Sequence, residues 1–217
     1  IAQHAAHEAV QNPMMITELT DYQTAGGSGV ITKNVLIDFA TSSNSTGWNG
    51  LTSFLEDATI PNLKYEDNEF TGIELKVTSR FNGQNTAGET VTTTDLNMPA
   101  EVSGNSFYGN SKGEWAGLLI EKGVLKLSGF QDDSTYEFCF FGSRTASDNR
   151  ETLYTVIGSN TGSAALNAAS NTDEVACVQG IQADASGEIM IEVTSGANND
   201  NGNGFFYINA MRIAPEE

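Results

Sequence analysis

From residue 34 to the end of the chain, apolar and polar residues alternate in short runs, the period-two pattern of strands with one buried face. Clusters of Gly, Asn, Asp and Ser separate the runs, and these residues favour turns. No long amphipathic helix lies between them, which disfavours an α/β architecture. The pattern predicts an all-β, antiparallel two-sheet β-sandwich. The predicted strands lie in NVLIDFA, TGIELKVTSRF, VTTTDL, GVLKLSGF, TYEFCFFG, ETLYTVIG, DEVACVQGI, GEIMIEVT and GFFYINAMRI.

The same pattern predicts one domain. Residues 1–14 are expected to form an N-terminal extension, helical or disordered, and residues 15–217 a single β-sandwich domain. No internal repeat and no linker-like stretch divides the second range. One segment, EWAGLLIEKG (114–123), fits either a short helix or a further strand.

The charge balance restricts the partners. Lys plus Arg number 10 and Asp plus Glu number 28, giving a net charge of −18. Nucleic acid and anionic lipid both require clustered cations, and no apolar run reaches the roughly 18 residues of a membrane span. We therefore expect neither nucleic acid nor membrane insertion. Abundant Gly, Ser, Thr and Asn are typical of secreted β-proteins, although no signal-peptide pattern is present.

The rare residues disfavour catalysis. The only histidines are His4 and His7, so a nucleophile–histidine pair has no imidazole in the predicted sandwich. GNSKG (109–113) matches the pattern GxSxG, but no histidine follows Ser111, and we interpret it as a turn. We expect no catalytic residue; a lyase that uses Tyr and Arg alone is a weaker alternative.

The two cysteines, Cys139 and Cys177, lie in apolar strand-like runs, and neither has a zinc-type neighbour. We favour two buried thiols, which behave as small hydrophobic side chains. A disulfide is the alternative if the two strands are neighbours in an exported protein.

Aromatic residues at turns are candidates for ligand contact. Trp48 lies in TGWNG beside Asn49, where no apolar periodicity demands an indole. An indole on a loop can stack on the C–H face of a sugar ring. Trp115, Tyr65 and Tyr108 are placed at comparable turns. Burial in the core is the alternative for each ring.

The densest polar stretch is FFGSRTASDNRETLYT, which carries Arg144, Asp148, Asn149 and Arg150 between two strands. Arginine is scarce in this acidic chain, so this concentration predicts specific partners. One interpretation is an Arg–carboxylate network that stiffens a hairpin. The other is a polar cradle for sugar hydroxyls or for the carboxylate of a uronic acid.

Acidic turns are compatible with a structural calcium ion, because Ca²⁺ prefers oxygen ligands from loops. No cluster matches an EF-hand loop, so the metal ligands are left unknown, and solvated turn carboxylates are the alternative. The clusters are Glu66, Asp67 and Glu69; Asp132 and Asp133; Asp173 and Glu174; and Asn199 and Asp200.

The order of the runs from VLIDFA to YINAMRI, with GSR…DNRETLYTV between them, resembles ancillary domains of secreted bacterial polysaccharide-active proteins. These domains are similar to galactose-binding-like and malectin-like jelly rolls. The resemblance covers roughly 34–214 and implies a jelly-roll sandwich, a non-catalytic carbohydrate-binding module and often a structural calcium ion. It supplies no verified site residues.

Together these observations predict a secreted, extracellular or cell-surface bacterial module that binds a polysaccharide or oligosaccharide. The module would be part of a larger secreted enzyme or surface protein, or attached to one. Its expected ligand-binding residues are Trp48, Asn49, Tyr65, Trp115, Arg144, Asp148, Asn149 and Arg150. The alternatives are a structural or adhesive sandwich without a glycan pocket, and a jelly-roll polysaccharide lyase or glycosidase.

Overall fold

The computed structural model describes residues 26–39, 45–131 and 133–216. The expected N-terminal extension, both histidines and Asp132 lie outside these ranges. Within them, no helix has the length and apolar character needed to cross a membrane.

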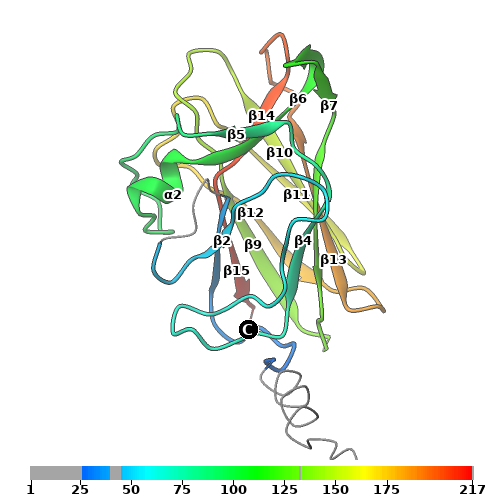
Figure 1. The fold of residues 1–217 in the computed structure, drawn as a ribbon. Helices are drawn as coiled ribbons and strands as arrows, with labels where there is room; N and C mark the ends of the chain where they lie inside the picture. The colour runs from blue at the N-terminus through cyan, green and yellow to red at the C-terminus, as the bar shows by residue number, and fades with distance from the viewer. Residues whose placement is uncertain (1–25, 40–44, 132, 217) are drawn as a thin grey trace, which may run out of the picture.

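The described chain is a β-sandwich of mostly antiparallel strands, as the alternation predicts (Figure 1). The one parallel pair among the described strands joins β1 (Val35–Phe39) to β2 (Asn49–Leu51), and all the other strand pairs are antiparallel. The five-stranded sheet has the order β12 (Ala176–Gln182), β9 (Thr135–Phe141), β15 (Ala210–Pro215), β1 (Val35–Phe39) and β2 (Asn49–Leu51). The six-stranded sheet has the order β11 (Thr161–Asn167), β10 (Glu151–Ile157), β13 (Glu188–Ser195), β8 (Gly123–Ser128), β4 (Glu74–Ser79) and β3 (Thr59–Ile60).

A third, smaller sheet lies at the end of the sandwich away from the C-terminus (Figure 1). Its long strand β6 (Ser106–Trp115) pairs with β14 (Phe205–Ile208), β5 (Gly83–Asn85) and β7 (Leu118–Ile120). A short helix, α2 (Ala100–Gly104), precedes β6.

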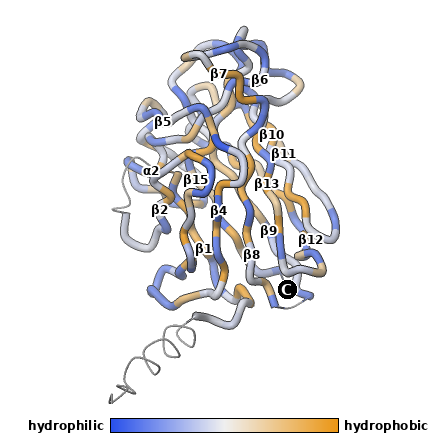
Figure 2. The backbone as a smooth tube through the Cα atoms, turned by 45° about the vertical axis from the view of Figure 1, so that its right-hand side comes forward, coloured by the Kyte–Doolittle hydropathy of each residue, from blue (hydrophilic) through white to orange (hydrophobic). Residues whose placement is uncertain are grey.

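The larger of two hydrophobic clusters in the described residues forms the main core between the sheets. Hydrophobic positions follow the strands, while many loops are hydrophilic (Figure 2). Phe140 of β9 stacks on Tyr154 of β10 at a centroid distance of 4.5 Å, which joins the two large sheets. The buried Tyr154 hydroxyl donates a hydrogen bond of 2.7 Å to the Tyr207 carbonyl. The main core is therefore connected directly to the third sheet.

Several local predictions were wrong. VTTTDL, expected as a strand, is a loop, whereas TGSAALN, whose first residues were assigned to a turn cluster, forms β11. GNSKG, interpreted as a turn, is part of β6. The segment 114–123, left open between a short helix and a further strand, contains the strand β7 in a hairpin with β6, so here the strand alternative is confirmed. The Arg-rich segment 142–150 crosses from one large sheet to the other, so it is not a hairpin.

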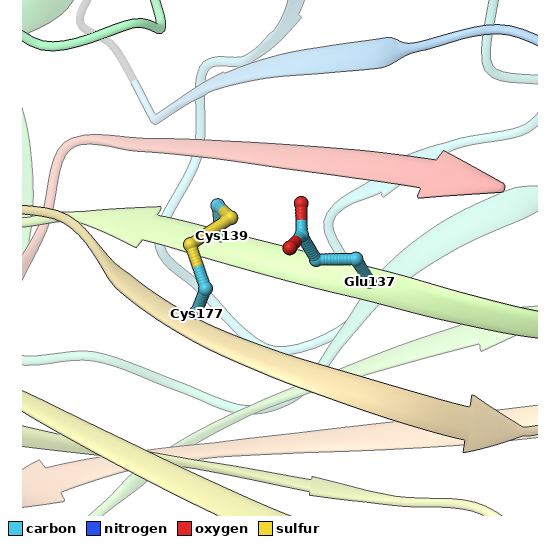
Figure 3. A group of neighbouring side chains, drawn as sticks. All are labelled: Glu137, Cys139 and Cys177. Carbon is cyan, nitrogen blue, oxygen red and sulfur yellow. A yellow bond between two sulfur atoms is a disulfide. The ribbon is translucent and has the colours of Figure 1, made fainter. Parts of the chain in front are cut away.

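Cys139 and Cys177 form a disulfide between β9 and β12, where the two residues are direct cross-strand partners (Figure 3). The preferred prediction of two thiols was wrong. The two cysteines are 38 residues apart in the sequence, and the sequence does not show that their strands, β9 and β12, are neighbours in the sheet. Glu137 lies beside the disulfide, but both sulfur atoms are already bonded to each other, so this group is not a metal site.

Candidate functional site

An open cavity of about 290 Å³ lies against the third sheet. Its wall combines aromatic rings with amide and guanidinium groups from four stretches of the chain. The lining residues are Gln84, Asn85, Tyr108, Trp115, Arg144, Arg150, Phe205 and Tyr207.

Strand pairing brings the aromatic rings together. Tyr207 of β14 is the direct partner of Tyr108 of β6, and Phe205 lies two residues earlier in β14, on the same face. The Tyr108 ring centroid is 5.9 Å from that of Phe205 and 6.4 Å from that of Tyr207. These spacings are typical of favourable edge and offset ring contacts. The result is a contiguous aromatic floor.

Trp115 extends this floor at the tip of the β6–β7 hairpin. It pairs with Leu118 across a two-residue turn of Ala116 and Gly117, whose φ angles are 54° and 77°. Two positive φ angles indicate a type I′ turn, which matches the twist of a hairpin. The indole contacts Phe205 edge-on at 5.4 Å and remains 49% exposed, so much of its surface faces solvent.

Two glycines allow the close packing of this sheet. A Cβ atom at Gly109 would lie 2.0 Å from the buried Phe206 ring, on the face opposite the cavity. A Cβ atom at Gly83 would lie 2.9 Å from the Tyr108 hydroxyl. Because both positions lack a side chain, Phe206 can fill the core while Tyr108 lies over β5.

An Asn-rich loop fixes the start of β14. The Asn199 amide donates hydrogen bonds to the carbonyls of Glu151 at 3.0 Å and of Phe205 at 2.8 Å. The Asn201 side-chain oxygen accepts from the backbone N–H groups of Asn203 and Phe205. The turn cluster SGANNDNGNG therefore holds Phe205 in place through its own side chains.

Arg150 is held firmly at the cavity. Its Nε donates to Asp148 at 2.9 Å, its Nη1 donates to the Tyr207 hydroxyl, and its guanidinium lies 5.5 Å from the Phe205 ring centroid. Burial opposes ionisation of Asp148, but hydrogen bonds from Asn201 and Arg150 outweigh it and hold the pKa of Asp148 below its ordinary value. Burial raises the pKa of Tyr207, and the Arg150 charge offsets only part of that effect.

Arg144 contributes a second guanidinium with different partners. Its Nη1 donates to the carbonyls of Ala87 and Thr145, both at 3.2 Å. Among the described residues it forms no ion pair with a carboxylate. The backbone N–H of Arg144 donates to the Ala168 carbonyl at 2.8 Å, which fixes the segment that carries it.

The amides of β5 complete the wall. Gln84 donates to the Thr52 carbonyl at 2.7 Å, and Asn85 donates to the Ser106 hydroxyl at 2.9 Å. Both side chains are half-buried, so they present fixed polar atoms at the edge of the aromatic floor.

The structure thus brings Trp115, Arg144 and Arg150 to one cavity. Asp148 does not line the cavity, but it accepts a hydrogen bond of 2.9 Å from Arg150 Nε. Asn149 has a structural contact, because its side-chain oxygen accepts from the Glu151 N–H at 2.9 Å. The expected Arg–carboxylate contact is present at Arg150, whose Nε bonds to Oδ1 of Asp148 in a single contact and not as a bidentate pair.

The other three expected ligand residues lie elsewhere, around a small cavity of about 40 Å³. The buried Asn49 side chain bonds to the backbone of Leu36 and Lys64. The Tyr65 hydroxyl donates to the Val30 carbonyl at 3.0 Å. Trp48 packs against a second hydrophobic cluster. Trp48 and Tyr65 also line separate cavities of about 310 and 290 Å³, respectively, and none of the three residues lines the cavity at the third sheet.

Sequence reasoning did not select Gln84, Asn85, Phe205 or Tyr207, and it left Tyr108 undecided. The available signal was GFFYIN, where aromatic residues occupy both faces of one strand. A strand with only one buried face needs apolar side chains on that face alone. The second aromatic face therefore indicated a contact outside the core.

Two of the acidic clusters have side chains with protein partners in the structure. Asp67 and Glu69 bond to Lys33 at 2.5 and 2.8 Å, and Asp200 accepts from the Asn149 N–H at 2.7 Å. Among the residues that the structure describes, no three carboxylates lie within 4.8 Å of one another.

No family model and no curated protein matches the chain. Among solved structures, it is similar to TmCBM61 in complex with β-1,4-galactotriose, with 16% identity over 52% of this chain and 70% of that chain, and a TM-score of 0.30. It is also similar to the ANXUR1 extracellular domain from Arabidopsis thaliana, with 14% identity over 86% and 49% of the two chains and a TM-score of 0.43.

A third similar structure is that of the plant peptide RALF23 in complex with FER and LLG2, with 13% identity, coverage of 85% and 48%, and a TM-score of 0.47. The chain spans about half the length of the plant chains that it matches.

Proposed function

We propose that this protein is a non-catalytic carbohydrate-binding module and that the cavity at the third sheet is its glycan site. The observation that supports this most directly is the half-exposed Trp115 ring, which contacts the aromatic floor and lines the same cavity as two guanidinium groups. Sugar rings have apolar C–H faces and polar rims, so they require stacking surface and hydrogen-bond donors at one place. This cavity supplies both.

The cavity is small and open. Its volume of about 290 Å³ is at the lower end of ligand pockets, which are roughly 300–1,000 Å³. It therefore accommodates part of a chain and not a long oligosaccharide. We expect affinities between micromolar and millimolar, on the order of 4–8 kcal/mol.

The lining residues favour binding over bond cleavage. None of them is an imidazole or a carboxylate, the usual general acids and bases of glycoside hydrolysis. Burial raises the pKa of Tyr207, which makes a tyrosinate harder to form and disfavours Tyr207 as the base of a lyase.

The Cys139–Cys177 disulfide supports a location outside the reducing cytosol. We propose that the module acts extracellularly, within or beside a larger polysaccharide-active or surface protein. A bound calcium ion remains part of this proposal. The binding measurement below, repeated with a chelator, tests that part.

The decisive variant is Trp115→Ala. Affinity gel electrophoresis across neutral and acidic polysaccharides selects a ligand, and calorimetry then gives the affinity. We expect Trp115→Ala to weaken binding at least tenfold, about 1.4 kcal/mol, because the exposed stacking surface is lost. Leu119→Ala is the matched control, since Leu119 is 46% exposed in the same hairpin and does not line this cavity.

Equal binding by Trp115→Ala and the parent would place the site elsewhere. Absence of binding across the panel would instead favour the structural or adhesive alternative. Reducing or unsaturated ends released by the isolated chain would favour the enzyme.

A further inference from the structure

The cavity at the third sheet differs in charge from its neighbours. Although the chain carries 28 acidic residues and 10 basic ones, no carboxylate lines this cavity among the described residues, whereas two arginines do. Three other cavities of comparable size, about 290 to 310 Å³, each have an acidic lining residue. Their acidic residues are Glu66 and Asp95, Glu66 and Asp67, and Glu121, respectively.

All ten Lys and Arg residues lie in the described ranges, and six of them pair with carboxylates: Lys33, Lys76, Lys122, Lys126, Arg150 and Arg212. Arg144 is one of the four that form no ion pair there, and it is the one of these four that lines the cavity at the third sheet. Arg144 bonds only to two carbonyl groups, which do not neutralise its charge. Because Asp148 balances Arg150, the two guanidinium groups leave the cavity with one uncompensated positive charge.

The bonding of Arg144 also leaves a specific edge available. Both of its hydrogen bonds within the described chain use Nη1. The edge formed by Nε and Nη2 is therefore uncommitted. That edge can donate two parallel N–H···O bonds to a carboxylate, the geometry in which arginine binds carboxylates most strongly.

From this arrangement we propose that the cavity selects an acidic glycan, with the carboxylate of a hexuronate unit bound by the Nε–Nη2 edge of Arg144 and its ring packed against the aromatic floor at Trp115. The inference rests on the proposed function, since it names the class of sugar for the same cavity. A neutral sugar would leave the Arg144 charge partly desolvated and unpaired, which disfavours its binding.

The test compares matched ligands that differ only in the anionic group. Oligogalacturonate and oligomannuronate are each measured by calorimetry against their carboxyl-reduced neutral counterparts. The buffer contains about 0.15 M NaCl, which screens the electrostatic repulsion between the acidic protein and an acidic ligand. We expect at least one of the acidic oligomers to bind at least tenfold more tightly than its neutral counterpart. Sulfated and unsulfated dextran form a second arm that separates carboxylate recognition from general attraction to anions.

Arg144→Gln removes the charge and keeps an amide donor for the carbonyl contacts. We expect it to weaken binding of the acidic oligomer at least tenfold and to change binding of the reduced oligomer less than twofold. Arg144→Lys keeps the charge without the two-donor edge, so we expect an intermediate loss. Arg80→Gln is the matched control, because Arg80 also bonds to two backbone carbonyls, those of Phe81 and Asn82, and does not line this cavity.

Each outcome separates this inference from the proposed function. If the reduced oligomers bind as tightly as the acidic ones, glycan binding stands and acidic selection fails. If Arg80→Gln costs as much as Arg144→Gln, or if only sulfated dextran binds, the assignment to Arg144 and a hexuronate is wrong. If no glycan binds the parent protein, both proposals fail.

Discussion

Asp38 is a carboxyl group in an environment that disfavours its charge. It is 1% exposed in β1, and neither of its oxygens has a hydrogen-bond partner among the residues that the structure describes. Burial and the neighbouring Glu101 charge raise the pKa of Asp38 from its ordinary 3.8 to about 7. The folded protein therefore holds a proton at Asp38 that the unfolded chain releases at lower pH.

This shift predicts a pH dependence of stability. A raised carboxyl pKa favours folding below the unfolded value of 3.8, and the advantage is lost as pH rises towards about 7. We expect Asp38→Asn to remove this loss of stability at high pH. The free energy of unfolding of the variant relative to the parent should therefore be higher at pH 8 than at pH 4, by on the order of 3 kcal/mol. Urea unfolding at both pH values measures the difference. An equal effect at both would show that Asp38 titrates normally.

At the same scale, the sequence indicated the scarce arginines correctly as residues with specific partners. Arg144 and Arg150 reach one cavity because the segment that carries them crosses between the sheets. The sequence did not show which of Trp115 and Trp48 contacts a ligand, because both lie next to polar or turn-forming residues. The difference arises from tertiary packing: Trp48 meets a second hydrophobic cluster, whereas Trp115 lies at a hairpin tip.

At the level of elements, the disulfide holds the edge strand β12 on β9. Joining residues 38 positions apart restricts the unfolded chain, which corresponds to roughly 4 kcal/mol in a chain-entropy description. We expect reduction to lower the free energy of unfolding by about 2–4 kcal/mol. Denaturation with and without a reductant measures this change. The double variant Cys139→Ala/Cys177→Ala should match the reduced parent and should not respond to the reductant.

An unchanged unfolding midpoint in a parent protein whose two thiols are shown to be free would contradict this expectation. Cys177 lies at an exposed position, so a reductant can reach the bond without prior unfolding.

Strands with clear alternation were predictable, and those defined by pairing were not. In GEIMIEVT, every second residue is buried, and the segment forms β13 as expected. By contrast, TGSAALN has few large apolar residues and becomes β11 because β10 pairs with it over its whole length. VTTTDL has strand-forming residues without a strand partner, and it remains a loop.

At the scale of the whole molecule, the net charge of −18 acts against an acidic ligand before contact. The Debye length falls from about 30 Å at 0.01 M salt to about 8 Å at 0.15 M. We therefore expect the association rate of an acidic oligosaccharide to rise several-fold over this range, while that of its carboxyl-reduced form stays constant. Surface plasmon resonance provides both rates. A rate that falls with added salt would mean that the Arg144 region dominates the long-range field.

The sandwich class was predictable because it follows from strand alternation and from the absence of long helices. The cavity was not, because its walls come from positions 84–85, 108–115, 144–150 and 205–207. The register of β14 on β6, and of β6 on β5, brings three of these stretches together, and the crossing segment between β9 and β10 brings the fourth. Neither register is encoded by a local motif.

That scattered origin has a consequence for how such a unit can be transferred between genes. Any break in the coding sequence between positions 84 and 207 would separate parts of the wall. A peptide excised from this interval would therefore carry isolated rings or a lone guanidinium. The complete cavity wall can be inherited, fused or transplanted only as an intact block.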